Sequence, residues 1–475
     1  MPVSPRYRPD PRFSALGPEF ADPVRPAAFP RAILRFRNHG AAASVGLDTL
    51  TDAEWVAHFA RFEPLRGNQA QPLAMRYHGH QFRVYNPDLG DGRGFLFAQL
   101  RETPERGGRL LDLATKGSGR TPWSRDGDGR LTLKGGVREV LAATMLQALG
   151  VPTSRAFSLI ETGEALQRGD EPSPTRSAVL TRLSHSHIRF GSFQRHAALG
   201  RGDLIRILLD HVVDAYFPDL ADAPERPVAV LRRAMERAAR LTARWMAAGF
   251  VHGVLNTDNM TITGESFDYG PWRFLPRNDP NFVAAYFDTG GLYSFGRQPE
   301  AVFWNLRQLA GALSLVGEVE QMVAVLNGFA GLYRRELAAA MVARLGVKPV
   351  SADADGQLAD LAFRALADGG EALRWEPFFF DWFGGLASEA RAMAGPRAAI
   401  YAGDAFTALR AAFEGREPSR PDALSTAYFR RSEPEELLID EVEALWGAIA
   451  EREDWSPLTA KLAAIDAMGA ALTTS

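Results

Sequence analysis

The chain contains no cysteine among its 475 residues. This absence excludes disulfides, cysteine-ligated zinc sites and thiol nucleophiles. Strong charge of one sign is also lacking, because the formal net charge is −3 at pH 7, and we expect no nucleic-acid partner. No run approaches the roughly 18 apolar residues that span a bilayer, and eight prolines stand within the first 30 residues instead of a signal-peptide core. We therefore expect a cytoplasmic protein without a membrane partner.

Hydrophobic residues make up 46% of the chain and charged residues 23%, which is typical of globular proteins. A chain of this length exceeds one hydrophobic core, so two or three packed units are expected. Two histidine pairs, His78/His80 and His185/His187, have the spacing that places both rings on one face of a strand. A metal site is one interpretation of these pairs. Hydrogen bonding of each ring around a strand end or loop is the other.

Residues 1–45 are rich in proline and arginine and lack sustained periodicity, which predicts an irregular arm within an N-terminal extension of residues 1–70 that wraps the fold. From residue 71 to 183, short β-type runs alternate with glycine-rich loops. One amphipathic helix is predicted among them at residues 136–149, ending at Gly150. The predicted strands are residues 81–85, 94–100, 110–115, 157–161 and 178–183.

Beyond residue 200 the apolar spacing becomes mostly helical, except over residues 251–275, where short strand-like pieces are predicted at 260–263 and 272–275. We predict an α+β, bilobal, protein-kinase-like fold. Residues 71–183 would form a β-rich N-lobe with one key helix, and residues 184–475 a larger, mainly helical C-lobe with a catalytic and metal-binding loop at 252–270. The helices are predicted at residues 204–217, 227–248, 301–315 and 319–345, with further helical stretches to the C-terminus.

The loop that begins at His252 resembles a kinase catalytic loop without its catalytic aspartate. In the pattern H-R-D-x-x-x-x-N, the Asp accepts the substrate proton and the Asn binds Mg²⁺, while a later D-F-G supplies a second metal ligand. Here Asn259 and Asp268 occupy the metal positions, but Val254 occupies the base position and cannot accept a proton. A new carboxylate, Asp258, directly precedes the asparagine. This pattern indicates nucleotide and metal binding with a reaction other than ordinary γ-phosphoryl transfer.

Two further features have the order found in kinase-type sites. Gly90, Gly92 and Arg93 belong to a glycine-rich turn whose backbone N–H groups could approach phosphates. A plain glycine-rich hairpin is the alternative. Lys116 ends a strand-like run and Glu139 lies in the first turn of the predicted helix, so that the pair could hold nucleotide phosphates. A surface lysine and a glutamate favoured near a helix N-terminus are the alternative.

The loop of residues 116–130 is long, charged and rich in glycine, which is typical of functional loops. Asp128 and Gly129 are candidates to contact the base or ribose. Arg182 and Arg189 could bind an anionic phosphate tail bidentately, although surface salt bridges would also explain them. Two arginines of the 116–130 loop could also contact phosphate, Arg120 and Arg125.

With these pieces in order, the chain resembles the selenoprotein-O family, or YdiU-like proteins, which are pseudokinase-fold enzymes that transfer AMP from ATP to protein hydroxyls. The similarity spans roughly residues 45–310. The matching stretches are residues 79–82, 86–93, 116–130, 137–140, 186–191, 254–260, 267–271 and 298–306.

The resemblance implies that ATP binds in a flipped orientation, so that the α-phosphate faces a Ser, Thr or Tyr hydroxyl and pyrophosphate leaves. It implies that Asp258 accepts the proton, that Asn259 and Asp268 bind Mg²⁺ or Mn²⁺, and that Glu139 holds the lysine. It also allows UTP as donor and self-modification. The implied nucleotide-binding positions are Gly90, Gly92, Arg93, Lys116, Asp128, Gly129, Arg182, Arg189 and Asp268.

The chain departs from the family in having no cysteine near its C-terminus, which excludes thiol redox control, and in having arginine at positions 83 and 273, where glycine is common in relatives. Two other functions stay open at this point. One is a phosphotransferase. The other is a catalytically silent nucleotide-binding scaffold, which the valine at the usual base position would favour.

Overall fold

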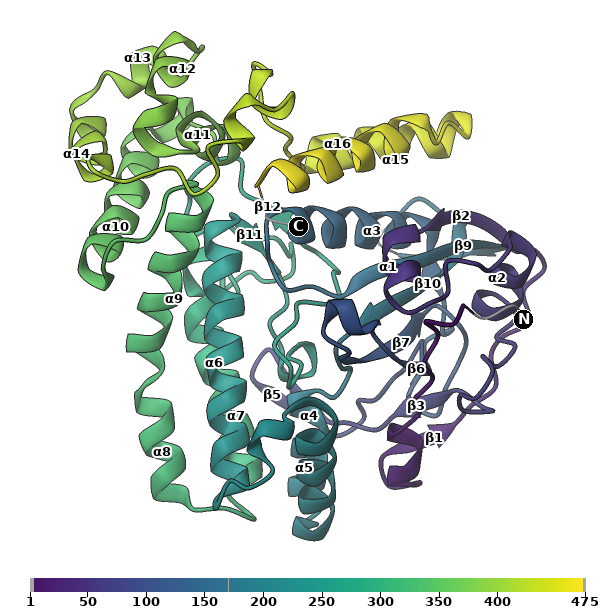
Figure 1. Cartoon of the computed structure of the whole chain (residues 1–475). Helices are drawn as coiled ribbons and strands as arrows, with labels where there is room; N and C mark the ends of the chain where they lie inside the picture. The colour runs from purple at the N-terminus through teal and green to yellow at the C-terminus, as the bar shows by residue number, and fades with distance from the viewer. Residues whose placement is uncertain (1–3, 170, 473–475) are drawn as a thin grey trace.

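The computed structural model describes residues 4–169 and 171–472. One large antiparallel sheet lies on the right in Figure 1, and a set of long helices stands beside it on the left. The expected combination of sheet and helices is thus confirmed. Among the described residues, no helix has both the length and the apolar character needed to cross a membrane.

The large sheet joins strands from distant parts of the chain, and every pairing within it is antiparallel. Three of the four runs predicted between residues 94 and 183 lie within strands, and the run at 94–100 overlaps a strand that begins at Leu96. In spatial order the strands are β1 (Ala21–Pro23), β3 (Leu73–Met75), β6 (Leu96–Arg101), β7 (Leu110–Lys116), β10 (Thr175–Ser184), β9 (Arg155–Leu166) and β2 (Ile33–Arg37), with β8 (Leu131–Thr132) paired to β10.

The two strands β1 and β2 correct the prediction of an irregular N-terminal arm. They form opposite edges of the large sheet, where β1 pairs with β3 and β2 pairs with β9. Neither strand shows a strong alternation of apolar and polar residues. An edge strand pairs with only one neighbouring strand, and both strands carry half-exposed residues. Sequence periodicity therefore could not reveal them.

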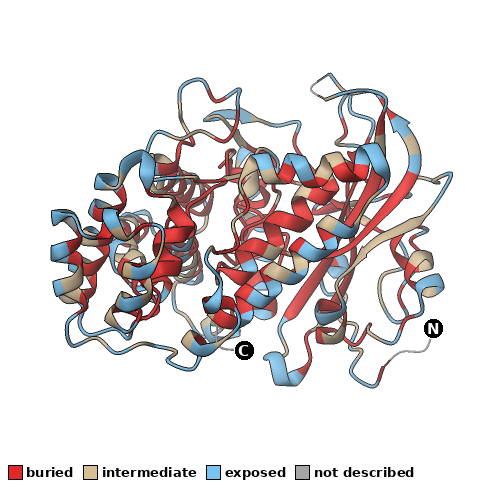
Figure 2. Cartoon of the chain, turned by 90° about the horizontal axis from the view of Figure 1, so that it is seen from above, coloured by how far each residue is buried: buried red, intermediate tan, exposed pale blue. Residues whose placement is uncertain are grey.

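Both faces of the sheet are buried. On β9, Leu159 packs in the core that contains helix α3 (Leu133–Ala148), and the next residue, Ile160, packs in the core that contains Trp55 of helix α2 (Asp52–Phe59). The pleat of a strand points successive side chains to opposite faces, which explains this division. Figure 2 shows the buried residues where sheet and helices meet. The sheet therefore has helices packed on both sides.

Helix α3 begins three residues earlier than predicted. The side chain of Thr132 accepts a hydrogen bond from the backbone N–H of Gly135, so Thr132 is the N-cap. Two glycines in the first turn had hidden this start, since glycine is a poor helix former. The cap fixes the helix against the end of β8, with Glu139 turned into the interior.

The helical part follows the predicted spans with one difference. The predicted helix at 319–345 is divided at Gly328 into two helices. Phe329 is the first residue of the second helix, and its ring stacks on that of Phe303 at 5.2 Å between ring centroids. The remaining helices are α1 (His39–Ser44), α4 (Phe190–Ala198), α5 (Gly202–Tyr216), α6 (Arg226–Ala247), α7 (Gln298–Leu313), α8 (Val319–Asn327), α9 (Phe329–Arg344), α10 (Ala352–Asp368), α11 (Trp375–Trp382), α12 (Glu389–Ala394), α13 (Ala398–Tyr401), α14 (Asp404–Phe413), α15 (Ile439–Arg452) and α16 (Ser456–Leu472).

Two small antiparallel hairpins lie outside the large sheet. Strands β11 (Phe250–Val251) and β12 (Arg273–Phe274) enclose the loop of residues 252–272, and β12 confirms the predicted piece at 272–275. Strands β4 (Gly79–Gln81) and β5 (Val84–Asn86) show that the strand predicted at 81–85 is wrong, because its centre is a turn. The strand-like piece predicted at 260–263 is also wrong, since it makes only a single bridge, from Thr261 to Arg189.

Candidate active site

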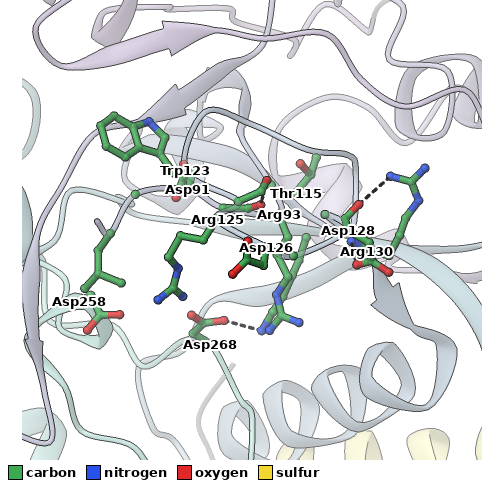
Figure 3. A pocket seen from close by; sticks show the side chains of 18 of the residues that line it. Asp91, Arg93, Thr115, Trp123, Arg125, Asp126, Asp128, Arg130, Asp258 and Asp268 are labelled. Atoms are coloured by element: carbon green, nitrogen blue, oxygen red, sulfur yellow. Dashed lines mark hydrogen bonds and ion pairs between the residues drawn. The ribbon is translucent and has the colours of Figure 1, made fainter. Parts of the chain in front are cut away.

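A cavity of about 680 Å³ lies between the glycine-rich loops of the sheet and the loop that follows β11. Figure 3 shows carboxylates and arginines from both parts of the chain converging on it. The fold therefore brings most of the predicted site residues together. Those that line the cavity are Gly90, Gly92, Arg93, Lys116, Asp128, Gly129, Arg182, Arg189, Asp258 and Asp268.

Lys116, at the end of β7, is the cationic centre of the site. Its ammonium group forms an ion pair with Glu139 of α3, the contact expected from the sequence. A second carboxylate, Asp268, lies 2.5 Å from the Lys116 Nζ through its Oδ1 atom. Lys116 and Glu139 are both almost fully buried. Glu139 thus lies behind the lysine and fixes its position without lining the cavity itself.

Asp268 adopts an unusual backbone conformation, with φ at +65°. A residue other than glycine is rarely found there, and such strain is often associated with functional sites. The conformation directs the carboxylate to Lys116 and to Arg182, whose Nη1 atom lies 3.4 Å from Oδ1. Burial raises the pKa of this carboxyl, but the positive charges of Lys116, Arg182 and Arg93 outweigh that effect and lower the pKa well below its usual range. Asp268 is therefore ionised.

Asp258 has the opposite electrostatic surroundings. It lies in a short 3₁₀ turn, Thr257–Asn259, and its buried Oδ1 atom has no hydrogen-bond partner among the described residues. Burial raises the pKa of Asp258 to about 6, against the lowering effects of its own backbone N–H and of Arg189. Arg125 points toward the space between Asp258 and Asp268 (Figure 3). Asp268 is thus a paired carboxylate, whereas Asp258 has an unpaired oxygen.

Asn259 lies beside Asp258 but does not line the cavity. Its Nδ2 atom donates to the carbonyl of Val254 at 3.0 Å. This bond uses the amide nitrogen and leaves the amide oxygen for another partner. Val254, at the base position of the kinase pattern, therefore holds the asparagine through its backbone.

The predicted glycines are required by the contact between two loops. A Cβ atom on Gly90 would lie 2.3 Å from the Trp123 ring, and one on Gly92 would lie 2.8 Å from the Trp123 carbonyl. Gly129 has φ at +71°, and a Cβ there would meet the backbone of Gly119 at 2.3 Å. Only glycine lets the backbones approach so closely. The same packing leaves backbone groups of both loops at the cavity.

Arg189 also lines the cavity, where it is buried and held by several partners. Its Nη1 atom lies 3.2 Å from Oδ1 of Asp91, and its guanidinium lies over the rings of Tyr77 and Phe267, at 4.3 and 5.1 Å from the centroids. Asp91 was not predicted to have a role, although it stands between the two glycines of the predicted turn. It also accepts a hydrogen bond from the backbone of Met75. Asp91 therefore connects the glycine-rich turn to Arg189.

The loop of residues 116–130 supplies further side chains. Asp128 is ion-paired with Arg168 at 2.9 Å, so part of its charge is compensated within the chain. Arg120 donates to the carbonyl of Arg125 and does not line the cavity. The cavity-lining side chains that the sequence had not singled out include Asp91, Trp123, Asp126 and Arg168.

The rings of His78 and His80 both make side-chain hydrogen bonds. His78 contacts the Tyr85 hydroxyl at 2.6 Å, and His80 contacts the side-chain amide of Gln194 at 2.8 Å. His187 lies 3.6 Å from Asp112 in the interior. Within residues 4–169 and 171–472, no group of three or more His, Asp or Glu side chains is arranged to hold a metal ion.

A cavity of this size, lined by cationic side chains, glycine-rich backbone and several carboxyl groups, has the features of a nucleotide-binding site in a group-transfer enzyme. Comparison with known families agrees. Residues 6–466 match the family model described as protein adenylyltransferase SelO, and the chain belongs to this family. It is therefore an enzyme of the class that transfers nucleotides onto proteins.

Curated relatives extend over much of the chain, and each is named protein nucleotidyltransferase YdiU. The protein from Synechococcus elongatus is 53% identical over 339 residues, covering 71% of this chain and 68% of the relative. The protein from Gloeobacter violaceus is 45% identical over 456 residues, covering 94% and 92%. The protein from Pseudomonas putida strain GB-1 is 40% identical over 362 residues, covering 76% and 73%.

Proposed function

We propose that this enzyme transfers AMP from ATP to a Ser, Thr or Tyr hydroxyl of a protein and releases pyrophosphate. The observation that carries the proposal is that two carboxyl groups at one cavity have different surroundings. Asp268 is ionised among cations, whereas Asp258 has an unpaired oxygen and a pKa raised to about 6. Transfer of a nucleotide to a hydroxyl requires a carboxylate that can bind a metal ion and a group that accepts the hydroxyl proton.

The lysine and arginine side chains at the cavity would bind the triphosphate. Lys116, Arg93 and Arg182 surround one carboxylate at the cavity, and Arg189 also lines it, with its guanidinium fixed by stacking. Guanidinium groups bind phosphate oxygens bidentately, and fixed positive charge stabilises negative charge that develops on a leaving pyrophosphate. The backbone at Gly90 and the neighbouring loop residues would complete the phosphate contacts.

The residues present also fit a divalent cation. Asp268 offers a carboxylate whose known contacts use only Oδ1, and Asn259 offers an amide oxygen, because its nitrogen is bonded to Val254. Hard oxygen ligands suit Mg²⁺ and Mn²⁺, which are commonly held by one or two protein groups together with substrate phosphates. When bound, the cation would neutralise phosphate charge and orient the nucleotide.

Asp258 would remove the proton from the acceptor hydroxyl. With a pKa of about 6 the carboxyl is mostly ionised at neutral pH, yet it is a better base than an ordinary aspartate. Its free Oδ1 atom leaves a place for the hydroxyl proton. Asp258 thereby takes the role that Val254 cannot.

We also propose that the fold is a bilobal protein-kinase-like one, with residues 71–183 as N-lobe, residues 184–475 as C-lobe and residues 1–70 as an extension that wraps it. Support comes from the Lys116–Glu139 ion pair between a strand and the helix α3. Asp268, which belongs to the loop of residues 252–270, contacts Lys116 of this pair.

Labelled nucleotide separates the candidate reactions. Incubation with ATP labelled at the α-phosphate should label protein, whereas ATP labelled at the γ-phosphate should not. The opposite pattern would make the enzyme a phosphotransferase. Binding of ATP in a calorimeter without either label being transferred, with Mg²⁺ or Mn²⁺, would make it a silent scaffold. Parallel incubation with α-labelled UTP tests whether UMP is also transferred, and intact-protein mass spectrometry detects self-modification.

A further inference from the structure

Four aromatic rings form a continuous row that leads from solvent toward the loop bearing Asp258. Tyr286 contacts Phe287 at 5.2 Å between ring centroids, Phe287 contacts Phe82 at 5.9 Å, and Phe82 contacts Tyr293 at 5.1 Å. The inner ring, Tyr293, is buried, whereas Tyr286 is 82% exposed and Phe287 is 47% exposed. We call these four residues the aromatic row. Adjacent exposed aromatic rings commonly mark a contact surface for another molecule.

The aromatic row is tied to the two residues that precede Asp258. The Tyr293 hydroxyl donates to Oδ1 of Asn256 at 2.7 Å, and the backbone N–H of Phe82 donates to the same oxygen at 3.0 Å. The next residue, Thr257, accepts from the backbone of His80 at 2.7 Å. The inner end of the row is thereby fixed beside the proposed base.

The hairpin of β4 and β5 forms part of the cavity wall as well. Gln81 lines the cavity, and a Cβ atom on Gly79 would lie 3.4 Å from the Cβ of Asp258. A polypeptide lying on the aromatic row would therefore pass over this hairpin to reach the proposed base.

The turn of the hairpin holds Phe82 in a strained conformation. Phe82 and Arg83 have φ at +50° and +64°, values that two-residue hairpin turns usually meet with Asn-Gly or Gly-Gly. Bulky residues at both positions cost free energy, and strain of this kind concentrates at ligand-binding sites. The strain places the Phe82 ring between Phe287 and Tyr293, where it joins the exposed and the buried parts of the row.

Two arginines beside the row share one glutamate. Arg83 pairs with Glu300 at 2.7 Å, and Arg297 lies 3.3 Å from the same carboxylate. A third exposed apolar side chain, Val84, belongs to the same hairpin and is 70% exposed. Because the charged neighbours are already paired, the surface favours an apolar group over a charged one.

We propose that the aromatic row is the docking surface for the acceptor polypeptide and binds an apolar side chain near the hydroxyl that receives the nucleotide. This inference rests on the proposed function and specifies its protein substrate. Three ring-to-ring steps of 5 to 6 Å correspond to about five residues of extended chain. The aromatic row itself thus spans about five residues of an extended acceptor chain, and we expect the apolar side chain several residues from the acceptor hydroxyl.

Fluorescent peptides of 11 residues test the docking directly. Each has a central serine, with phenylalanine, aspartate or lysine placed four residues to either side, and binding is measured by fluorescence anisotropy. The unmodified enzyme should bind the phenylalanine peptides about tenfold more tightly than the charged peptides, the effect expected for burying one large apolar side chain. The double variant Tyr286→Ser/Phe287→Ser should lose this preference. Equal affinity for all the peptides, or an unchanged preference in the double variant, would overturn the proposal.

A matched control keeps this result specific. The double variant Val319→Ser/Val323→Ser removes two exposed apolar side chains from α8 and should retain the full preference. Tyr286→Ser alone should also reduce the preference for the phenylalanine peptides. It leaves the contact between Phe287 and Phe82 in place. Loss of the preference in the α8 variant too, or a change in oligomeric state as the only effect of the Tyr286/Phe287 variant, would overturn the proposal.

Transfer kinetics separate this proposal from the proposed function. With the phenylalanine peptides, Tyr286→Ser/Phe287→Ser should raise the KM of AMP transfer about tenfold and leave kcat within about twofold, while ATP binding by calorimetry stays unchanged. Peptide binding without transfer to any acceptor would contradict the proposed function and leave the docking surface standing. Transfer at equal efficiency to all peptides would contradict the docking surface alone.

Discussion

Replacing Asp258 with asparagine should stabilise the free enzyme and at the same time nearly abolish transfer. The folded protein raises the pKa of this carboxyl from 3.8 to about 6, chiefly through burial. At about 1.4 kcal/mol for each tenfold change in proton affinity, the rise corresponds to about 3 kcal/mol. Because the side chain is half-buried at the cavity wall, solvent screening reduces the expected gain to about 1–2 kcal/mol.

The sign of the effect follows from the direction of the pKa change. The pKa is higher in the folded protein than in the unfolded chain, so the protonated carboxyl is compatible with folding and the carboxylate opposes it. The free-energy cost of holding the buried carboxylate is absent below pH 3.8, the pKa in the unfolded chain. It reaches its full value once the pH has risen above about 6, the pKa in the folded protein. Asparagine does not ionise, so its advantage over aspartate should appear over this interval and stay constant above it.

Thermal unfolding in metal-free buffer provides the assay. For a chain of this size we expect Asp258→Asn to raise Tm by roughly 1–4 °C at about pH 7.5 and to leave it nearly unchanged at about pH 4. Removal of a general base should lower the transfer rate by about 10²- to 10⁴-fold at neutral pH. The control Asp126→Asn removes an exposed carboxylate at the same cavity and should change stability by less than about 0.5 kcal/mol. A Tm that falls at neutral pH, or one that shifts equally at both pH values, would refute the reasoning.

Three other substitutions probe the site and its support. Asp268→Ala should abolish metal-dependent AMP transfer, measured with α-labelled ATP, because one of two proposed metal ligands is lost, and unchanged transfer would mean that the metal lies elsewhere. Lys116→Met should weaken ATP binding at least about tenfold in calorimetry, and an unaltered affinity would remove the lysine from the phosphate site. Gly90→Ala should lower stability by about 1–3 kcal/mol in thermal unfolding, because its Cβ would lie 2.3 Å from Trp123, whereas Gly356→Ala, which meets no atom within 4 Å, should not.

Much of the candidate site could be predicted because its residues stand in short, ordered motifs. The pattern from His252 to Asn259 indicated the displaced carboxylate, and Lys116 could be paired with Glu139 because the lysine ends a strand-like run and the glutamate lies near the start of the next predicted helix. Asp91 was missed as a partner of Arg189, since 98 positions along the chain separate the two and only the folded loops bring them within 3.2 Å. Local patterns reveal residue types and their order, but not such distant pairs.

The secondary structure shows the same division. Strong periodicity predicted β6, β7, β9, β10 and the major helices. The strand predicted at 81–85 is instead a hairpin turn, because the backbone of Phe82 is held by Asn256, far along the chain. The edge strands β1 and β2 were missed because their pairing partners, not their own pattern, define them.

The sequence by itself determined the family, the order of the chemical groups and the absence of thiol chemistry, since these depend only on which residues are present and in what order. Only the tertiary structure decided that Asp268 is ionised among cations while Asp258 keeps an unpaired oxygen and a raised pKa. The two carboxyl groups are chemically identical in the unfolded chain. Their difference arises from burial and from the distance to positive charge, which exist only once the chain has folded.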